Sequence, residues 1–386
     1  MDPTRRARRQ RLARRQRVLI GLALGALVVG VVVTAGAMLR DDPSKSSLAA
    51  LDRPAFSEAP DSTSPSTAPA PPSTRGTTGS GEPVTFAFGG DVHFEGSLRA
   101  RLGDPSTALS SIAPTLAAAD VAVVNLETAV TERGTPANKA FVFRAPASAL
   151  TALAAAGVDT ASVANNHGLD YGLEGLVDTL AAEQSTGFDV IGIGYNSTDA
   201  YTPHRMEVKG QRIAIIAATQ VLDDEFISSW TATDTQPGLA SAKEVDRLVA
   251  AVQAARADTD TLVVFLHWGI EGQTCPSPVQ QELATQLVDA GADIVVGSHA
   301  HRVLGGGRLG DAVVDYGLGN FVFYNESGGA GDSGVFQVTA TGQQIDSYQW
   351  LPARIVGGTP QLLEGTAAEQ ASASWETLRV CTGLTP

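Results

Sequence analysis

The chain has 386 residues, with 27 lysines and arginines against 41 aspartates and glutamates. Eight of the basic residues lie between Arg5 and Arg17, whereas Asp2 is the only acidic residue before residue 40. The remainder is therefore strongly acidic, with 19 basic and 40 acidic side chains. A protein that binds nucleic acid needs a basic stripe, so this balance excludes nucleic acid as a partner. An anionic substrate would have to be attracted locally, by metal ions or by particular arginines.

An uncharged apolar segment of 22 residues, from Val18 to Leu39, follows the arginines. As a helix it would be about 33 Å long, enough to cross a hydrocarbon core of about 30 Å. The arginines predict that residues 1–17 stay in the cytoplasm and that the chain beyond the segment lies outside it. We therefore expect a single-pass protein of the cell membrane with an extracytoplasmic C-terminal domain. A cleaved signal peptide is the alternative, because Ala-Gly-Ala at 35–37 has the form of a cleavage site.

Residues 40–82 are rich in Pro, Ser, Thr and Ala and contain almost no large apolar side chains. Such a segment cannot bury enough surface to fold, so we expect a disordered linker. The folded domain is predicted to occupy residues 83–386.

Within that domain, short β-rich runs alternate with alanine-rich helical segments. Strands are expected at 84–88, 121–124, 159–163, 189–193, 212–217, 262–266 and 294–296, and helices at 108–119, 147–156, 173–184, 242–255 and 279–290. The last three strand segments are nearly continuous apolar runs, which is typical of strands buried on both faces. Residues 313–323, 334–341 and 347–354 look like successive strands without helices and predict an antiparallel layer. We therefore expect two packed sheets with helices outside.

Five of the six histidines lie in short motifs, each of which follows a predicted strand. The motifs are GDVH at 90–93, NNH at 165–167, HWG at 267–269 and SHAH at 298–301, and NLE at 125–127 adds a carboxylate. Aspartate and histidine are common ligands of first-row metals. Each motif alone has a plain structural explanation: a cap for Asp91 or Glu127, a turn for the two asparagines, or a core position for His267. Together they indicate a metal site at one edge of a sheet.

The spacing of the two histidines in the SHAH motif suggests how they could bind two metal ions. Residues i and i+2 of a strand are roughly 6.5 Å apart, and the two metals of a shared site are about 3.5–4 Å apart. His299 and His301 could therefore serve one ion each. Glu127 could bridge the two cations and offset their repulsion.

The order of these motifs resembles the CapA family of capsule and poly-γ-glutamate biosynthesis proteins. The resemblance covers most of residues 84–324 and includes NNHxxDxG at 165–172, HWGxE at 267–271, DYGLGNF at 315–321 and FRAP at 143–146. That family is similar to the calcineurin-like metallophosphoesterases. The resemblance implies an α+β fold, a four-layer α/β/β/α sandwich of mixed sheets.

The resemblance also implies a role for individual residues. One divalent cation would be held by Asp91, His93 and His301, the other by Asn166, His267 and His299, with Glu127 between them. Asp91 and His167 are the expected catalytic residues, His167 as a general acid or as a donor to the transition state. Substrate-binding candidates are Arg144, Arg302 and Asn320, although both arginines could equally be solvated surface residues. Candidates for orienting the ligands are Glu95, Asp170 and Glu271. The ligand types suit Mn, Zn or Fe alike.

This chain departs from the family pattern at three positions. Glu127 replaces the aspartate that bridges the metals in phosphoesterases, and Gly317 replaces the serine of the late motif. Many family members lack a histidine at the first motif, so His93 restores the phosphoesterase-like set and favours metal binding here.

The function that follows is a metal-dependent hydrolase or transferase acting on an anionic cell-surface polymer, by resemblance poly-γ-glutamate or a capsular polysaccharide. Other subunits of polymer synthesis are the expected protein partners. An extracellular phosphoesterase and a non-catalytic subunit for polymer binding or export are the alternatives. Cys275 and Cys381 could form a disulfide outside the cytoplasm, or remain two unpaired thiols.

Overall fold

The computed structural model describes residues 79–386. The predicted membrane segment at 18–39 and nearly all of the predicted linker lie outside the described residues, so both stay predictions. Within residues 79–386, no helix is both long enough and apolar enough to cross a membrane.

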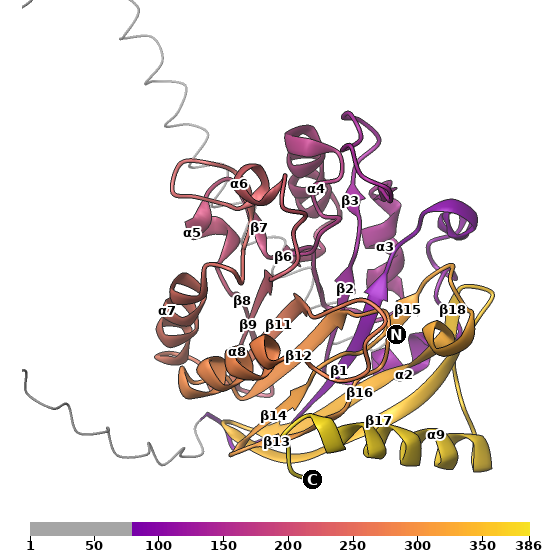
Figure 1. Ribbon diagram of the computed structural model, residues 1–386, viewed down its shortest axis with the longest axis vertical. Coiled ribbons are helices and arrows are strands. Elements are labelled where there is room, and N and C mark those ends of the chain that lie inside the picture. Colours follow the sequence, from indigo (N-terminus) through magenta and orange to yellow (C-terminus); the bar gives the residue numbers. More distant parts are fainter. Residues whose placement is uncertain (1–78) are drawn as a thin grey trace, which may run out of the picture. The chain divides into compact units, whose positions relative to one another are not determined.

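Two mixed sheets form the centre of the domain (Figure 1). The larger has eight strands in the order β18-β17-β16-β1-β2-β5-β6, with β15 also paired to β1. Its strands are β1 (Val84–Val92), β2 (Val121–Leu126), β5 (Thr160–Ser162), β6 (Asp189–Ile191), β15 (Asn320–Val322), β16 (Asp332–Thr341), β17 (Gln344–Val356) and β18 (Thr359–Leu362). The neighbours β1, β2, β5 and β6 run parallel, whereas β16, β17 and β18 are antiparallel.

The smaller sheet has six strands in the order β13-β14-β12-β11-β9-β8. They are β8 (His204–Val208), β9 (Gln211–Thr219), β11 (Thr261–Trp268), β12 (Ile294–His299), β13 (Gly306–Leu309) and β14 (Ala312–Asp315). The four central strands are parallel, and an antiparallel strand closes each edge. Two short pairs also occur, β3 (Ala129–Val130) with β4 (Arg144–Ala145) and β7 (Ile193–Gly194) with β10 (Gly238–Leu239).

The main helices are α2 (Ala113–Ala118), α3 (Ser148–Ala155), α4 (Gly172–Thr186), α7 (Val245–Arg256), α8 (Pro278–Asp289) and α9 (Gly365–Leu378). Shorter ones are α5 (Ser197–Ala200), α6 (Ile227–Trp230) and the 3-10 turns η1 (Gly96–Gly103), η2 (Gly328–Gly331) and η3 (Arg379–Cys381).

Successive side chains of each strand point to opposite faces of its sheet, and packing on both faces of the two sheets produces four layers. Phe86 and Phe88 of β1 pack in the core between the sheets with Ile215 of β9 and Phe265 of β11, whereas Ala87 faces the opposite side. That opposite side of the larger sheet is covered by α2, α3 and α4, and the outer face of the smaller sheet by α7 and α8. The predicted four-layer α/β/β/α sandwich of mixed sheets is confirmed.

The structure corrects three predictions about elements. Residues 313–323 form no single strand: the chain turns at Gly319 (φ 69°) and passes from β14 of the smaller sheet to β15 of the larger. The strands β16 to β18 extend the larger sheet and do not form a separate antiparallel layer. The helix predicted at 108–119 shortens to Ala113–Ala118, because a proline in its first turn favours a helix start there. The sequence patterns did not predict β8, β13, β18 or α9.

The carboxyl ends of the parallel strands of both sheets lie on the same side of the molecule. In the larger sheet Asp91 of β1 pairs with Asn125 of β2, and in the smaller sheet His267 of β11 pairs with Ser298 of β12. The predicted motifs are therefore carried to one edge by strand register.

Candidate metal centre

Asp91 joins the two sheets at this edge. Its side chain is fully buried, and its Oδ1 accepts a hydrogen bond from Asn125 Nδ2 at 2.8 Å. Its Oδ2 accepts from the backbone N–H of His299, at the end of β12, at 3.2 Å. The carboxylate is thus fixed between neighbours from both sheets.

Glu127 follows β2 and has the most unusual environment. It is fully buried, yet neither carboxylate oxygen accepts a hydrogen bond. Its Oε1 lies 3.5 Å from His267 Nε2 and 4.0 Å from His167 Nε2. Burial and the nearby charge of Asp91 raise the pKa of Glu127 well above its usual range. A buried carboxylate without partners is costly unless a cation neutralises it.

His267 and Asn166 approach each other from opposite sheets. His267 Nε2 lies 2.8 Å from Asn166 Oδ1, and His267 Nδ1 lies 3.0 Å from Ser298 Oγ. Burial, together with nearby histidines, lowers the pKa of His267 well below its usual value. The imidazole is therefore neutral, the form that binds metal.

The SHAH motif makes a turn where a continued strand was expected. Strand β12 ends at His299, and both His299 (φ 93°) and His301 (φ 52°) adopt the left-handed region. Residues other than glycine enter this region rarely, and such strain is often found at functional sites. The turn directs both rings to the centre, with their centroids 5.9 Å apart.

His301 is held by Asn320 of β15. Its Nδ1 lies 2.8 Å from Asn320 Oδ1 and 3.3 Å from Asp91 Oδ2. Asn320 Nδ2 donates to the carbonyl of Ala330, so the amide is fully used in orienting His301. Asn320 thus supports His301 in this structure, and its predicted role in substrate binding stays a prediction. Burial lowers the pKa of His301, but the charges of Glu127 and Asp91 outweigh it and raise the value to about 10.

His167 belongs to a buried polar chain. Its Nδ1 lies 2.6 Å from Asp170 Oδ2, and Lys139 Nζ lies 3.1 Å from Asp170 Oδ1. Lys139 also binds the carbonyl of Asn166 and pairs with Asp223 at 3.3 Å. This chain fixes the ring of His167 and leaves its Nε2 facing Glu127.

His93 sits among aromatic rings at one side of the centre. Its ring stacks on Phe143 at 4.7 Å and meets Phe323 at 4.2 Å and Tyr324 at 4.6 Å. Its Nδ1 accepts a hydrogen bond from the backbone N–H of Glu95 at 3.0 Å, and its Nε2 is buried without a partner. Burial, reinforced by His167 and His301, lowers the pKa of His93 to about 3.

The remaining predicted residues surround this centre. Glu95 accepts from the backbone N–H of Arg144, whose guanidinium lies 4.7 Å above the ring of Tyr171. The guanidinium of Arg302 lies against Gly329. The carboxylate of Glu271 lies within 4.8 Å of ligand atoms of His299 and His301.

The loop that carries Glu271 is tied to the C-terminus. Cys275 and Cys381 form a disulfide with a Cα–Cα distance of 5.7 Å. The backbone N–H of Gly272 also donates to the carbonyl of Ala300, at 2.8 Å. Both links hold the loop beside the SHAH turn.

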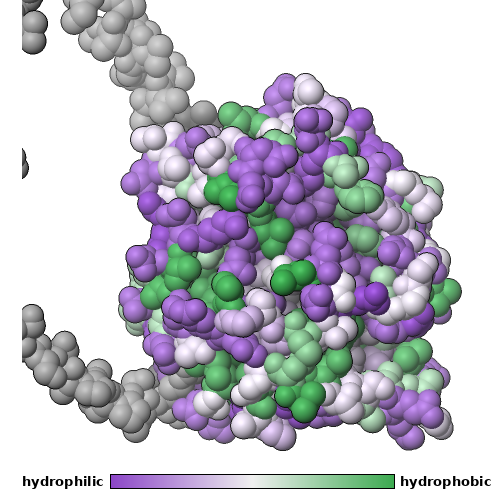
Figure 2. All heavy atoms as spheres, viewed as in Figure 1, coloured by the Kyte–Doolittle hydropathy of each residue, from purple (hydrophilic) through white to green (hydrophobic). Residues whose placement is uncertain are grey.

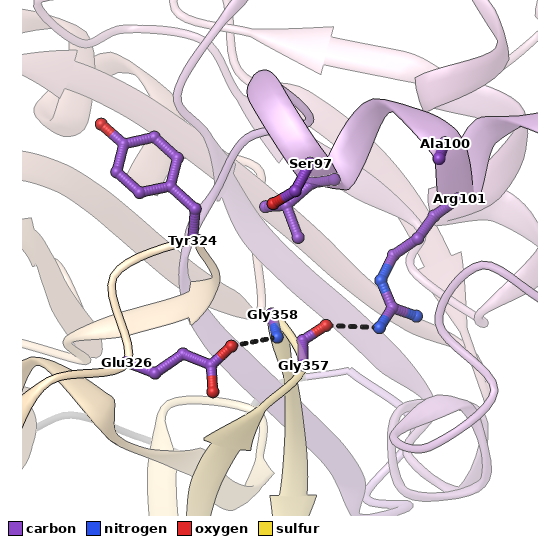
Figure 3. Close-up of a pocket in the computed structure, with 8 residues that line it drawn as sticks. Ser97, Ala100, Arg101, Tyr324, Glu326, Gly357 and Gly358 are labelled. Atoms are coloured by element: carbon purple, nitrogen blue, oxygen red, sulfur yellow. Dashed lines mark hydrogen bonds between the residues drawn. The ribbon is translucent and has the colours of Figure 1, made fainter.

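A pocket of about 490 Å³ opens beside the aromatic rings (Figure 3). Tyr324, Arg101 and Glu326 line the pocket. Arg101 donates a hydrogen bond to the carbonyl of Gly357, and the backbone N–H of Gly358 donates to Glu326, so both side chains are bound to the turn before β18. Because Tyr324 also touches His93, this pocket borders the candidate site.

The side chains at the centre fit metal cations. Within residues 79–386, three groups of ligand atoms lie within 4.8 Å of one another. Two are buried or nearly so, one from Asp91, Glu127 and His301 and the other from Glu127, His267 and His299, and the third adds the exposed Glu271 to His299 and His301. Glu127 belongs to both of the first two groups. Buried polar atoms normally have partners, so the free oxygens of Glu127 and the free Nδ1 of His299 are those of a site built for positive charge.

Several residues of the site carry no signal in a single sequence. Lys139, Phe323 and Tyr324 lie in no metal-ligand pattern and reach the site only through loop packing. Asn125 and Ser298 also belong to the site, because they contact Asp91 and His267. Their position inside the recognised motifs is the sequence signal that could have identified them.

The family model described as "Bacterial capsule synthesis protein PGA_cap" matches residues 85–325, more than half of the chain. The chain belongs to this family. The resemblance drawn from the motifs is confirmed. The matched range contains every predicted ligand from Asp91 to His301.

The relatives agree with this assignment. The chain is 34% identical over 209 residues to the capsule biosynthesis protein CapA of Bacillus anthracis (53% of this chain and 50% of that one). It is 32% identical over 208 residues to the PGA biosynthesis protein CapA of Bacillus subtilis strain 168 (54% and 53%). It is 31% identical over 192 residues to a probable polyglutamine synthesis accessory protein of Mycobacterium tuberculosis (48% and 50%). The chain spans about half the length of the curated relatives it matches.

Among solved structures, a hypothetical protein from Thermus thermophilus matches with a TM-score of 0.45 at 18% identity, over 70% of this chain and 100% of that one. The 5'-nucleotidase of Candida albicans matches with a TM-score of 0.41 at 10% identity, over 77% of this chain and 58% of that one.

Proposed function

We propose that this chain acts outside the cytoplasmic membrane, anchored by residues 18–39, in the synthesis or export of an anionic cell-surface polymer of the capsule or poly-γ-glutamate type. Two divalent cations, Mn, Zn or Fe, would be its cofactors. Membership of the capsule synthesis family and the printed names of its relatives support the polymer class. The same names support other polymer synthesis subunits as partners.

Glu127 is the observation that carries the metal part of the proposal. A fully buried carboxylate without hydrogen-bond partners lies between two groups of imidazole and carboxylate ligands. Asp91, Glu127, His267, His299 and His301, with the amide oxygen of Asn166, would hold the cations.

The chemistry would be hydrolysis or transfer at a phosphoryl or acyl centre. When bound, divalent cations supply Lewis acidity, which activates water and offsets negative charge in the transition state. His167, fixed by Asp170 through its Nδ1, would act as a general acid in its protonated form, which the carboxylate of Asp170 favours, and would pass the proton on Nε2 to the leaving group. Arg144 and Arg302 would attract the anionic chain to an otherwise acidic domain.

Metal content tests this proposal. The purified full-length chain, loaded with Mn²⁺ or Zn²⁺ and dialysed, is expected to retain two equivalents by elemental analysis. His301→Ala and Asn166→Ala should each lower that content, whereas His204→Ala, in β8 and outside the centre, should not. Retention of less than one equivalent by the wild-type chain would overturn the metal part of the proposal.

A polymer assay separates catalysis from binding. In cells that produce the polymer, a ligand variant such as His301→Ala should abolish the chain's contribution if turnover is required. Normal polymer export by that variant, together with its loss on deletion of residues 83–386, would favour a non-catalytic export subunit. Cleavage of simple phosphate esters, abolished by His167→Ala, would instead favour a phosphoesterase.

A further inference from the structure

The hydrogen-bond partner of His93 decides which of its ring nitrogens carries the proton. A backbone N–H, that of Glu95, points to Nδ1 at 3.0 Å, and a backbone N–H can only donate. Nδ1 must therefore offer its lone pair. In the neutral imidazole the proton then sits on Nε2, which cannot at the same time bind a metal through a lone pair.

His167 and His301 differ from His93 in this respect. Nδ1 of His167 meets a carboxylate oxygen of Asp170, and Nδ1 of His301 meets the amide oxygen of Asn320, and both partners can accept. His267 is bonded differently, because its Nδ1 lies 3.2 Å from the amide nitrogen of Asn125 as well as 3.0 Å from the hydroxyl of Ser298. The ring of His301 can therefore keep its proton on Nδ1 and leave the lone pair of Nε2 free, as metal-ligating histidines do.

Aromatic rings surround His93 and also contact two of the other histidines. Phe143 stacks on His93 on one face and on His167 on the other, at 4.7 and 4.2 Å. Phe323 contacts both His93 and His301, at 4.2 and 4.9 Å. His93 belongs to none of the groups whose ligand atoms lie within 4.8 Å of one another in residues 79–386.

Glu271 is grouped with His299 and His301 by the distances between their ligand atoms. Its carboxylate lies within 4.8 Å of ligand atoms of His299 and His301, on the solvent side of the centre. The hydrogen bond from Gly272 to Ala300 and the disulfide at Cys275 hold its loop in place. An exposed carboxylate there can meet an incoming cation before the buried ligands do.

We propose that Glu271, and not His93, completes the ligand set around His299 and His301, and that His93 offers its Nε2–H to the substrate as a neutral hydrogen-bond donor. The Nε2 atom is buried without a partner, and Tyr324, whose ring contacts His93, also lines the pocket of about 490 Å³. This inference rests on the proposed function, since it assumes that the centre holds divalent cations.

Titration of the purified full-length chain with Mn²⁺ compares the two residues directly. Glu271→Gln should weaken Mn²⁺ binding about 10-fold or more, the range for groups that support a metal. His93→Gln, which keeps an amide donor, should leave the affinity unchanged. His93→Ala should also keep the metal but bind inorganic phosphate more weakly in the Mn²⁺-loaded protein. The matched control is Glu282→Gln, an exposed acid on α8 away from the centre.

Three results would overturn the inference: loss of a metal equivalent in His93→Gln, wild-type affinity in Glu271→Gln, or a proton on Nδ1 of His93. The last is read by ¹⁵N NMR of the imidazole rings in the metal-free protein, which needs no substitution. If the wild-type chain takes up no Mn²⁺, the proposed function fails and the Glu271 assignment fails with it. The tautomer measurement still decides the role of His93 in that case.

Discussion

The two histidines of the SHAH motif differ in charge in the metal-free protein. Burial, reinforced by the charge of His301, lowers the pKa of His299 to about 3, despite the opposing effect of Asp91. His301 instead has a pKa of about 10, because its carboxylate neighbours outweigh the effect of burial. In the metal-free protein His301 therefore supplies a positive charge beside Asp91 and Glu127. A bound cation would take over that role, and His301 would then release its proton to act as a ligand.

A first prediction concerns the side chain of Glu127. Glu127→Gln should reduce metal affinity by at least about 100-fold, beyond the 10–100-fold typical of supporting groups, because it removes the shared carboxylate. In the metal-free protein the same change should leave the free energy of unfolding unchanged or raise it, since a buried carboxyl without partners is lost. Metal titration and urea unfolding measure the two effects. Glu132→Gln, at an exposed surface position, is the control, and a large loss of metal-free stability would contradict the explanation.

At the level of elements, the centre depends on the close approach of β1 and the chain before β15. Asp91 pairs with Asn320, and its backbone N–H donates to the carbonyl of Gly319 at 3.0 Å. A Cβ at Gly90 would lie 1.9 Å from that carbonyl oxygen, so only glycine fits. This pairing brings both Asp91 and Asn320 close to Nδ1 of His301.

Gly90→Ala should therefore push the two segments apart. We expect a loss of at least about 3 kcal/mol in the free energy of unfolding, at the upper end of ordinary substitutions, together with weaker metal binding. Gly103→Ala is the matched control, because a Cβ there meets nothing within 4 Å. Urea unfolding and metal titration provide the measurements, and equal stability of the two variants would refute the packing argument.

At the scale of the whole molecule, the disulfide connects the C-terminal segment after α9 to the loop of the candidate centre. Cys275 and Cys381 are separated by 106 residues, so their link restricts a long loop of the unfolded chain. Replacing both by serine should lower the free energy of unfolding by about 2–5 kcal/mol and loosen the Glu271 loop. Unfolding and Mn²⁺ titration with and without reductant measure both effects. Reductant should not affect the variant; a response there would point to another cause.

Asp315 makes the stability of the whole fold depend on pH. It is fully buried at the end of β14, and burial raises its pKa to about 7, although the backbone N–H of Gly317 donates to it. The unfolded value is about 3.9, so between pH 4 and 7 the folded protein holds a proton that the unfolded chain releases. This contribution is fully present below pH 4 and is lost as the pH rises through 7.

Asp315→Asn should therefore flatten the decline of the unfolding free energy between pH 4 and 7. At pH 8 the variant should be more stable than wild type, by at most on the order of 4 kcal/mol for a shift of about three units. Urea unfolding at several pH values tests this. Asp311→Asn, on the exposed turn before β14, is the control, and parallel curves for wild type and Asp315→Asn would disprove the effect.

The visible face of the domain is mainly hydrophilic. In the view of Figure 2 hydrophilic residues cover most of that face, and apolar residues lie among them.

Local patterns in the sequence were sufficient to predict most of the central strands, two packed sheets with helices outside them and the edge at which the motifs meet. Apolar runs identify buried strands, and the carboxyl ends of parallel strands share an edge, so residues after those runs come together. Glu127, Asn166 and His267 could be grouped in this way from the sequence alone. What the sequence could not decide depends on contacts between distant segments. Tertiary packing decides where the chain passes from β14 to β15 and which partners Lys139, Glu271 and His93 meet. These contacts cannot be predicted from residue type, because the hydrogen-bonding role of a side chain depends on the atom that lies opposite it.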